Sequence, residues 1–311
     1  MILMKPFSVL SVNGELVIEG ASVGSTTAPP YLRDRDVDLK ASFKPVPSPT
    51  GILILPYIPA TSWVGVMRNL LEKYYDLPAN VPRVVRAKKI VAPIHECEGE
   101  DDKARCPVCK LLARRDVVAW FDDAEPLGSL LRIREGADEV SIFNERGALV
   151  AKVYLKDEVI IPRENVQVNA QKYGGELGIS EPKNLLTAED IKGAGWRLET
   201  IPRKAQLVSG TFKFSAKFLL SKLSVDDIRP FFVGLSLLQD YYIGRRGSRG
   251  YGRLEISNLS FSVRGRSYYD GSGDEIRVDL PEDARTPKGV LRKWEEVKRA
   301  IEEALKKAIG Q

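Results

Sequence analysis

Histidine, methionine and cysteine are scarce in this chain of 311 residues, which contains one, three and three of them. An odd number of cysteines argues against a secreted disulfide scaffold. No apolar run approaches the ~20 residues that a membrane-spanning helix needs, and the apolar stretch of Met1 to Pro6 is too short for a signal peptide. These absences predict a cytoplasmic protein without a membrane partner.

Two further observations limit the function. The phosphate-binding pattern GxxxxGKS or GxxxxGKT does not occur, so a P-loop enzyme is excluded. The net charge is only +5, so the overall charge identifies no class of partner. The distribution of charge along the chain is therefore more informative than its sum.

The chain has enough hydrophobic residues, 43%, to bury a sizeable core, and we expect one domain over residues 1–311. The hydrophobic patterns predict, in chain order, a strand at 7–18 with a turn at Asn13-Gly14, a helix at 61–75 capped by Thr61 or Ser62, strands near 130–134, 149–155 and 158–161, a strand at 207–219, a helix at 224–242, a strand at 253–263, and a helix at 287–308 in a C-terminal region 285–311. This order is typical of an α+β fold with a ferredoxin-like or RRM-like core and insertions.

Three segments are predicted to be insertions in this core. Residues 20–56 are rich in proline, serine, glycine and charge, which favours a loop or lid. Residues 77–128 hold every cysteine and form a metal-containing insertion. Residues 163–200 are polar, contain glycine and show no clear period, which indicates a projecting loop or hairpin.

The metal-ligating residues are clustered. His95, Cys97, Cys106 and Cys109 gather the only histidine and all the cysteines of the chain into 15 residues. A CxxC turn grips one ion with two thiolates, and His95 and Cys97 complete a tetrahedron typical of zinc. Four protein ligands leave no open position, so the predicted Zn²⁺ site is structural. The alternative is a group of buried, inert cysteines near an unrelated histidine.

A loop rich in glycine and arginine, residues 244–253, carries four of each in ten residues. Glycines let backbone amides turn toward an anion, and guanidinium groups match the geometry of phosphate. Residues 249–252 also match the first half of the RRM signature, whereas the later base-stacking aromatics are absent. The pattern predicts binding to RNA phosphates, and the alternative is a solvated charged face. The predicted RNA-binding residues of this loop are Gly244, Arg245, Arg246, Gly247, Arg249, Gly250, Gly252 and Arg253.

A second anion site is predicted at the helix start 59–68. The free amides at a helix N-terminus favour anions, and Ser62 and Arg68 are the predicted RNA-binding side chains there. The equally weighted alternative is an ordinary capped helix with Trp63 in the core.

Taken together, these segments resemble the RAMP superfamily of CRISPR proteins, and within it the backbone subunit of type III effector complexes. Residues 57–68 are similar to the family segment IPGSSLKGxxR, residues 244–252 to its glycine-rich loop, and residues 106–112 to its zinc segment CPVCRLFG. Weaker similarities at 16–25 and 197–202 follow the family's order.

The resemblance implies a fold, partners and an activity. It implies an RRM-like palm, copies of the chain stacked along a guide RNA with other effector subunits, and a thumb hairpin, here 163–200, that interrupts the duplex of guide and target RNA. It also implies cleavage of target RNA, supported by an acidic residue after the first strand and a divalent metal such as Mg²⁺.

The chain departs from the family at this acidic position. Residues 24–29 contain no carboxylate, and Asp34, Asp36 and Asp38 lie further along. A shifted loop would bring Asp34 or Asp36 to the scissile phosphate, where a carboxylate can hold Mg²⁺. The alternative is that these aspartates pair with Arg33 and Arg35 at the surface and that the chain does not cleave RNA.

Two other functions remain open from the sequence. One is a stand-alone endoribonuclease that processes CRISPR repeat RNA, but such chemistry often uses a histidine base and the only histidine is the predicted zinc ligand. The other is a non-catalytic, zinc-stapled interaction module that docks through its C-terminal helix.

Overall fold

Helices and antiparallel sheets make up the computed structural model, which confirms the predicted α+β class. Asp34, Asp36, Arg246, the predicted strand at 158–161 and most of the predicted hairpin at 163–200 lie outside the described residues. Among the helices of the described part, none is long and apolar enough to cross a membrane. The structure describes residues 6–23, 42–48, 51–85, 89–112, 118–126, 131–135, 139–143, 149–154, 196–201, 205–245 and 247–310.

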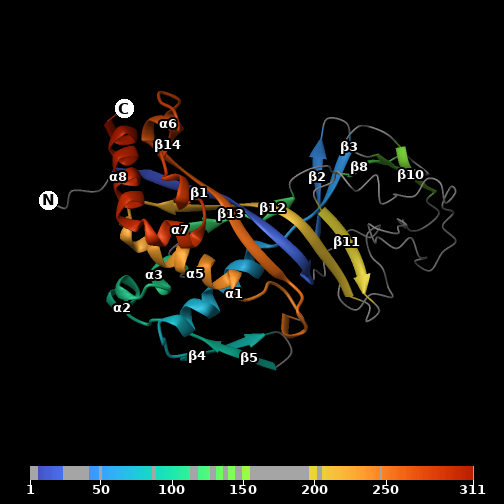
Figure 1. Ribbon diagram of the computed structural model, residues 1–311, viewed down its shortest axis with the longest axis horizontal. Coiled ribbons are helices and arrows are strands. Elements are labelled where there is room, and N and C mark those ends of the chain that lie inside the picture. Colours follow the sequence, from blue (N-terminus) through green and yellow to red (C-terminus); the bar gives the residue numbers. More distant parts are fainter. Residues whose placement is uncertain are drawn as a thin grey trace.

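The central sheet is built around β1 (Ser8–Ala21), which pairs antiparallel with β12 (Ala205–Leu219) on one side and β13 (Arg253–Gly265) on the other (Figure 1). Side chains of β1 alternate between buried and more exposed positions over residues 12–19, the pattern that predicts a strand, whereas residues 8–12 are all buried. The turn expected at Asn13-Gly14 was wrong, because β1 runs straight through it. Gly14 is needed there since a Cβ would lie 2.6 Å from the Phe214 ring.

The other edge of β12 is shared by three short strands. The strand β11 (Trp196–Ile201) pairs with the start of β12, and Trp196 lies opposite Gly210. Further along, Pro126 lies opposite Phe212 and Phe121 lies opposite Ala216. The last two pairings belong to β7 (Glu125–Pro126) and β6 (Ala119–Phe121), and β14 (Ile276–Arg277) pairs with β13.

Two helices cover one face of this sheet. They are α1 (Ala60–Tyr74), which lies in the chain between β1 and β6 of this sheet, and α5 (Arg229–Gln239), which joins β12 to β13. Trp63 and Met67 of α1 are fully buried, and the Trp63 ring packs edge-on against Phe214 with 5.6 Å between centroids. Gly234 of α5 lets the helices approach closely, because a Cβ there would lie 2.4 Å from Met67 Cγ. This packing produces the main core.

The predicted C-terminal helix is two helices, α7 (Pro287–Arg292) and α8 (Trp294–Gly310). Thr286 caps α7 by accepting a hydrogen bond from the Gly289 amide, 3.1 Å. The helix ends at Lys293, and this break lets the Trp294 indole donate to Asp226, 3.1 Å. Three 3₁₀ turns and one short helix complete this part of the chain: Asp226–Ile228, Gly247–Arg249, Glu282–Ala284 and α6 (Arg266–Asp270).

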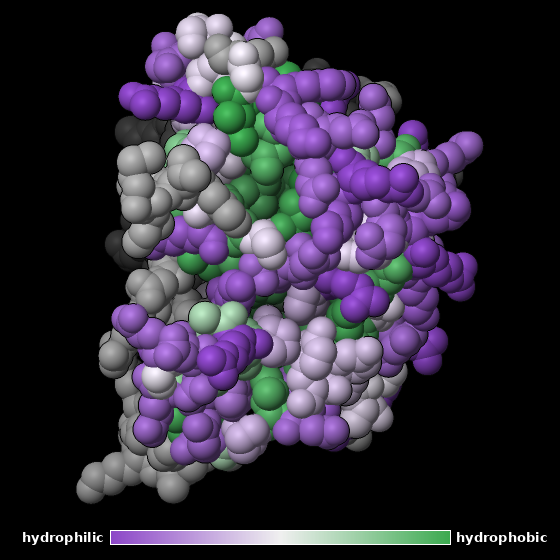
Figure 2. Space-filling model, turned by 90° about the vertical axis from the view of Figure 1, so that its left-hand side faces the viewer, coloured by the Kyte–Doolittle hydropathy of each residue, from purple (hydrophilic) through white to green (hydrophobic). Residues whose placement is uncertain are grey.

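The end of the molecule formed by α6 and α8 carries exposed hydrophobic side chains. Figure 2 shows hydrophilic side chains over most of this face, with a strip of hydrophobic ones between them. Phe7 and Ile309 are 46% and 43% exposed here. The ring of Phe7 packs edge-on against Tyr269, with 5.4 Å between centroids. This end lies at the opposite end of β13 from residues 244–253, the loop rich in glycine and arginine (the Gly/Arg loop).

A second, five-stranded antiparallel sheet lies beside the first (Figure 1). Its edge strand, Phe43–Ser48, and the neighbouring strand, Gly51–Pro56, fall within residues 20–56. The sequence predicts a loop or lid for this whole segment, so the prediction is wrong for these two strands. Pro45 and Pro47 favoured a loop, but an edge strand tolerates prolines because their missing amides face no partner. In spatial order the strands are β10 (Leu149–Tyr154), β9 (Glu139–Phe143), β8 (Leu131–Glu135), β3 (Gly51–Pro56) and β2 (Phe43–Ser48).

The segment 77–128 begins as a separate hairpin and ends in the central sheet. It contains β4 (Val81–Val85), β5 (Lys89–Ile94), α2 (Glu100–Arg105) and α3 (Cys109–Leu112). The strands β6 and β7 close it, so the predicted insertion is shorter than expected at its C-terminal side.

Candidate nucleic-acid interface and metal centre

The four predicted metal ligands come together in the fold. One ligand atom from each of His95, Cys97, Cys106 and Cys109 lies within 4.8 Å of all the others. The imidazole Nε2 lies 3.2 Å from Cys97 Sγ and 3.5 Å from Cys106 Sγ. A tetrahedral zinc ion with ordinary bond lengths places N and S ligands about 3.5 Å apart. The cluster could therefore hold a metal ion.

The surroundings of these ligands orient them for a metal. The other imidazole nitrogen, His95 Nδ1, lies 2.9 Å from the Pro78 carbonyl, which turns Nε2 toward the cysteines. The Cys109 amide donates to Cys106 Sγ, 3.3 Å. Hydrogen bonding from the Cys109 thiol lowers the pKa of Cys106 to about 4, whereas burial raises the pKa of Cys97. The site thus favours the thiolate form of Cys106 even without the charge of a metal ion.

Arg68 has a different role from the predicted one. Its guanidinium donates to the carbonyls of His95 and Leu112, at 2.6 and 2.9 Å, and pairs with Glu72 at 2.8 Å. The side chain is only 14% exposed. Arg68 therefore fastens the metal-binding segment to α1, and all three of its guanidinium nitrogens already donate within the protein. We do not retain it as an RNA ligand.

A second link fastens the same segment to the start of α5. Lys110, next to the metal ligand Cys109, pairs with Asp227 at 2.7 Å. Burial acts to raise the pKa of Asp227, but hydrogen bonds from Lys110 and Ser224 outweigh it, so the pKa is lowered. Ser224, the predicted cap, exchanges hydrogen bonds with Asp227 in the turn before α5. The metal cluster is thus tied to both core helices.

The Gly/Arg loop, residues 244–253, is folded against the end of β1. The Arg245 amide donates to the Ser22 carbonyl at 2.9 Å, and the Gly252 amide donates to the Glu19 carbonyl at 3.0 Å. Gly244 and Gly252 have φ of 86° and 80°, a left-handed conformation that glycine adopts at low cost. A Cβ on Gly252 would lie 2.1 Å from the Ile243 carbonyl oxygen. These glycines therefore fix the path of the loop.

The loop presents its arginines to solvent. Arg245, Arg249 and Arg253 are exposed, and none makes a hydrogen bond or ion pair to another residue that the structure describes. Gly250, between the last two, has open space around its Cα, because a Cβ there would meet nothing within 4 Å. Unpartnered guanidinium groups beside an open backbone are the arrangement expected of a phosphate-binding surface.

A chain of hydrogen bonds links this loop to the residues just before α1. Ser22, whose carbonyl accepts from the Arg245 amide, is followed by Val23, whose carbonyl accepts a hydrogen bond from Ser42 Oγ. The Ser42 carbonyl in turn accepts from the Tyr57 amide. The predicted cap by Thr61 or Ser62 was wrong, because the helix begins at Ala60. Asp123, which sequence reasoning missed, accepts from the Ala60 amide at 2.8 Å. RNA binding by Ser62 stays a prediction. The amide of Ala60, two residues before it, already donates to the Asp123 carboxylate.

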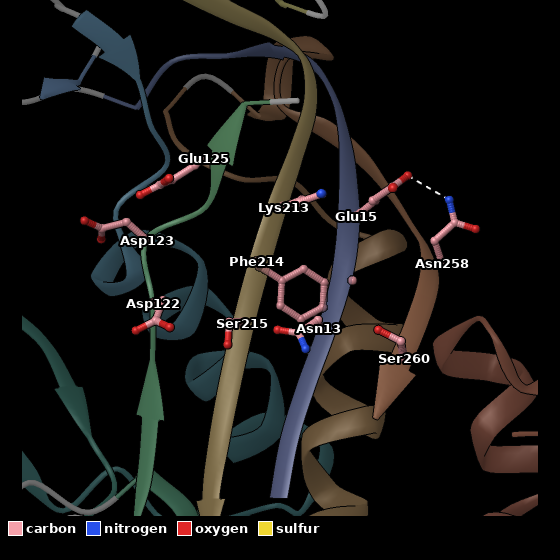
Figure 3. Close-up of a pocket in the computed structure, with 11 residues that line it drawn as sticks. Asn13, Glu15, Asp122, Asp123, Glu125, Lys213, Phe214, Ser215, Asn258 and Ser260 are labelled. Carbon is pink, nitrogen blue, oxygen red and sulfur yellow. Dashed lines mark hydrogen bonds between the residues drawn. The ribbon is translucent and has the colours of Figure 1, made fainter. Parts of the chain in front are cut away.

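The open face of the central sheet is acidic. A groove of about 690 Å³ there is lined by Glu15, Asp122, Asp123 and Glu125, with Lys213 among them (Figure 3). In many RRM domains this face carries aromatic residues that stack on bases. Here Asn13, Ser215 and Ser260 occupy it instead, and the carboxylates repel phosphate. The geometry thus favours RNA at the Gly/Arg loop over RNA on the sheet.

Comparison with known proteins identifies the family. The RAMP superfamily profile matches residues 53–255, which span the start of α1, the metal cluster and the Gly/Arg loop. The chain belongs to the RAMP superfamily. RAMP relatives include a protein of Methanothermobacter thermautotrophicus named CRISPR system Cms endoribonuclease Csm3, which is 26% identical over 71% of this chain and 75% of its own length.

Three further proteins are similar to this chain. A protein of the same name from Methanocaldococcus jannaschii is 28% identical over 39% of this chain, and the match spans less than half, 46%, of that relative. A chain in a Csm3-Csm4 subcomplex of a type III-A CRISPR-Cas interference complex covers 94% of this chain, and 97% of that chain is covered, at a TM-score of 0.43 and 16% identity. A chain of a type III-B Cmr-beta complex bound to target RNA covers 82% of this chain and is itself covered over 61%, at a TM-score of 0.37 and 17% identity.

Proposed function

We propose that this RAMP protein binds guide RNA as a backbone subunit of a type III CRISPR interference complex. The superfamily match and the relatives named Csm3 support this assignment. Its partners are then guide RNA, target RNA, other effector subunits and further copies of the chain. The protein would act in the cytoplasm, where such guide RNA is found.

The observation that carries the proposal is a set of exposed arginines, without partners among the described residues, on a backbone shaped by glycine. Arg245, Arg249 and Arg253 lie within one loop that is held to the end of β1. Each can form forked hydrogen bonds to a phosphate, and the open backbone at Gly250 allows a strand to approach closely. Arg246, Gly247 and Ser62 are further proposed contacts.

The core is proposed to be ferredoxin-like with insertions. Along the chain the core strands are β1, then β6 with β7, then β12, then β13. In the sheet their order is β13, β1, β12 and then β6 with β7, so the first strand lies between the fourth and the third. The helices α1 and α5 each connect two of these strands and lie on one face. A zinc ion held by His95, Cys97, Cys106 and Cys109 would fasten the insertion to this core. Its role would be structural, since four protein ligands leave no position open for catalysis.

Cleavage of target RNA is proposed as a second activity of the same subunit. The relatives' name contains the word endoribonuclease. Asp34 or Asp36, in the segment that follows β1, would hold Mg²⁺ at the scissile phosphate. A histidine-based processing enzyme is less favoured because both nitrogens of the only histidine face the Pro78 carbonyl and the cysteine cluster.

The salt dependence of RNA binding tests the proposal. We expect the full chain to bind a single-stranded RNA with an affinity that falls steeply as salt rises. The triple variant Arg245→Ala, Arg249→Ala, Arg253→Ala should reduce the slope of log K against log salt by about 2, because each lost phosphate contact on a single strand changes it by about 0.7. Fluorescence anisotropy at several salt concentrations measures both quantities.

A matched control removes the same charge elsewhere. The variant Arg266→Ala, Arg292→Ala, Arg299→Ala changes three exposed arginines on α6, α7 and α8. It should leave the slope close to that of the wild type. If both triple variants lowered the slope equally, the Gly/Arg loop would not be the binding site, and only the net charge would matter.

A further inference from the structure

A pair of tyrosines lies between α5 and the Gly/Arg loop. The rings of Tyr241 and Tyr242 are stacked, with 4.2 Å between centroids and 18° between planes. Their hydroxyl groups lie 3.3 Å apart and share a hydrogen bond. The two tyrosines come just after α5 in the chain and match none of the motifs found in the sequence.

Gly247 of the loop packs directly on this pair. A Cβ on Gly247 would lie 2.0 Å from Tyr242 Cγ, so the glycine backbone occupies one face of that ring. Tyr241 therefore stacks on the opposite face, because one ring face has room for a single neighbour at this distance. The order of the stack is Gly247, Tyr242, Tyr241, and the outermost ring, Tyr241, is 38% exposed.

The charges around the stack suit a nucleic acid. Gly247 lies between the exposed Arg245 and Arg249 in the chain. The hydrogen bond with Tyr241 raises the pKa of Tyr242, while the Lys73 ammonium is near enough to act in the opposite direction. A phenol is neutral near pH 7 even at its ordinary pKa, and the shift of Tyr242 acts in the same direction, so this ring adds no negative charge beside the arginines.

We propose that Tyr241 is the stacking platform for one base of the RNA strand whose phosphates the Gly/Arg loop binds, an inference that rests on the proposed function. Single-stranded nucleic acids are commonly held by a positive surface together with aromatic rings, because every base has a π-face. A rigid, pre-stacked ring loses little conformational freedom when a base is added to it. The preference is for an unpaired base and not for a particular sequence.

Two probes with equal numbers of phosphates separate stacking from charge. The first is a single-stranded RNA of mixed sequence, and the second is an abasic oligonucleotide of the same length. We expect Tyr241→Ala, and more so the double variant Tyr241→Ala with Tyr242→Ala, to weaken binding of the RNA by about 5- to 150-fold. The affinity for the abasic probe and the salt slope should remain unchanged.

Two further variants serve as controls. Tyr241→Phe keeps the ring and should bind RNA like the wild type. Tyr269→Ala removes another exposed tyrosine, 53% exposed, at the far end of β13, and should also have no effect. A 2-aminopurine base placed in the RNA reports stacking directly, because its fluorescence is quenched when it stacks on the ring.

The outcomes distinguish the two proposals. If the wild type binds neither probe at low salt, the proposed function fails, and the stacking role fails with it. If the wild type binds both probes but the tyrosine variants weaken both equally, or weaken neither, phosphate binding stands and the stacking role is overturned. Selective loss of RNA binding with an unchanged abasic control supports it.

Discussion

At the scale of single residues, the glycines of the Gly/Arg loop do unequal work. Gly250 and Gly252 have nearly the same left-handed φ, 84° and 80°. A side chain on Gly250 would enter open space, whereas one on Gly252 would lie 2.1 Å from a backbone oxygen. The Ile243 amide also donates to the Gly252 carbonyl at 2.8 Å. The second glycine therefore supports the loop and the first leaves it accessible.

This difference predicts different costs for two matched substitutions. Gly250→Ala should destabilise the chain by about 1–2 kcal/mol, the cost of a left-handed non-glycine residue. Gly252→Ala adds a backbone clash and should cost about 3 kcal/mol or more. Urea unfolding of both variants measures this difference. Equal losses of stability would mean that the contact with Ile243 does not constrain the loop.

Arg68 shows why a residue's role is hard to read from its motif. The spacing of residues 59–68 places an arginine about two helical turns into α1, where an RNA contact is reasonable. The structure turns this side chain inward, because the carbonyls of His95 and Leu112 need donors. These acceptors lie 27 and 44 residues away in the chain. No local pattern could have predicted them.

At the scale of elements, the segment from β5 to α3 depends on its ligands. The short helices α2 and α3 have 6 and 4 residues, too few to be stable alone. The helix α2 has no buried residue. The burial of Val108 and Leu111 in the core holds part of this segment, and the proposed coordination of a zinc ion by four side chains would hold the rest.

Removing two ligands should release the metal. We expect about one zinc ion per wild-type chain, and zinc content close to zero in the double variant Cys106→Ser with Cys109→Ser. The variant should also unfold at a lower temperature, because Arg68 and Lys110 would lose the fixed segment that they bind. Mass spectrometry for metals and a thermal scan give the two readouts. Asp101→Asn, an exposed acid between the ligands, is the control and should keep its zinc.

Elements with strong periodicity could be predicted from the sequence, and those set by distant contacts could not. The alternation of Phe212, Phe214 and Phe218 predicts β12, and the apolar spacing around Met67 predicts α1. The break at Lys293 follows from the contact of Trp294 with Asp226, which lies 68 residues earlier. The hairpin of β2 and β3 was concealed by prolines that an edge strand accepts.

At the scale of the whole molecule, one ion pair joins the C-terminal helix to the core. Lys298 of α8 pairs with Asp226, and the Trp294 indole donates to the same carboxylate. The hydrogen bond from Lys298 lowers the pKa of Asp226, against the effect of burial. The pKa of Lys298 is raised by the same contact. The pair is thus charged over a wide pH range.

The sign of these shifts predicts an effect of acid. Because the folded pKa of Asp226 lies below its ordinary value of 3.8, the pair stabilises the fold above about pH 4 and is lost as pH falls through the folded pKa. Asp226→Asn should cost up to about 1 kcal/mol at pH 7, since the carboxylate is 55% exposed. The difference from wild type should shrink and disappear as pH falls through the lowered folded-state pKa of Asp226.

Denaturant unfolding across this pH range checks the prediction. A constant difference between Asp226→Asn and wild type at all pH values would mean that packing, and not charge, accounts for the effect. Asp122→Asn is a suitable comparison, because Asp122 pairs with Lys217 at 2.7 Å but joins neighbouring strands of one sheet. Its substitution should leave the attachment of α8 unchanged.

The candidate site was predictable where chemistry follows from residue type. The cysteines and histidine of the metal cluster and the arginines of the loop carry their chemistry in their identity. The acidic groove, the inward Arg68 and the stacked tyrosines arise from the register of strands and from helix ends. Those relations are fixed by tertiary packing, so they became visible only in the folded chain.

The shared edge of β12 has an evolutionary consequence. The chain leaves the central sheet at Pro126, opposite Phe212, and rejoins it at Trp196, opposite Gly210. Exit and return are two residues apart along one strand, a separation of about 7 Å. The described strands between these two points, β8, β9 and β10, belong to the second sheet, which they join through the pairing of β8 with β3, so they form an insertion whose ends are close together. Its length can therefore drift among descendants while the scaffold that carries the arginines keeps its shape.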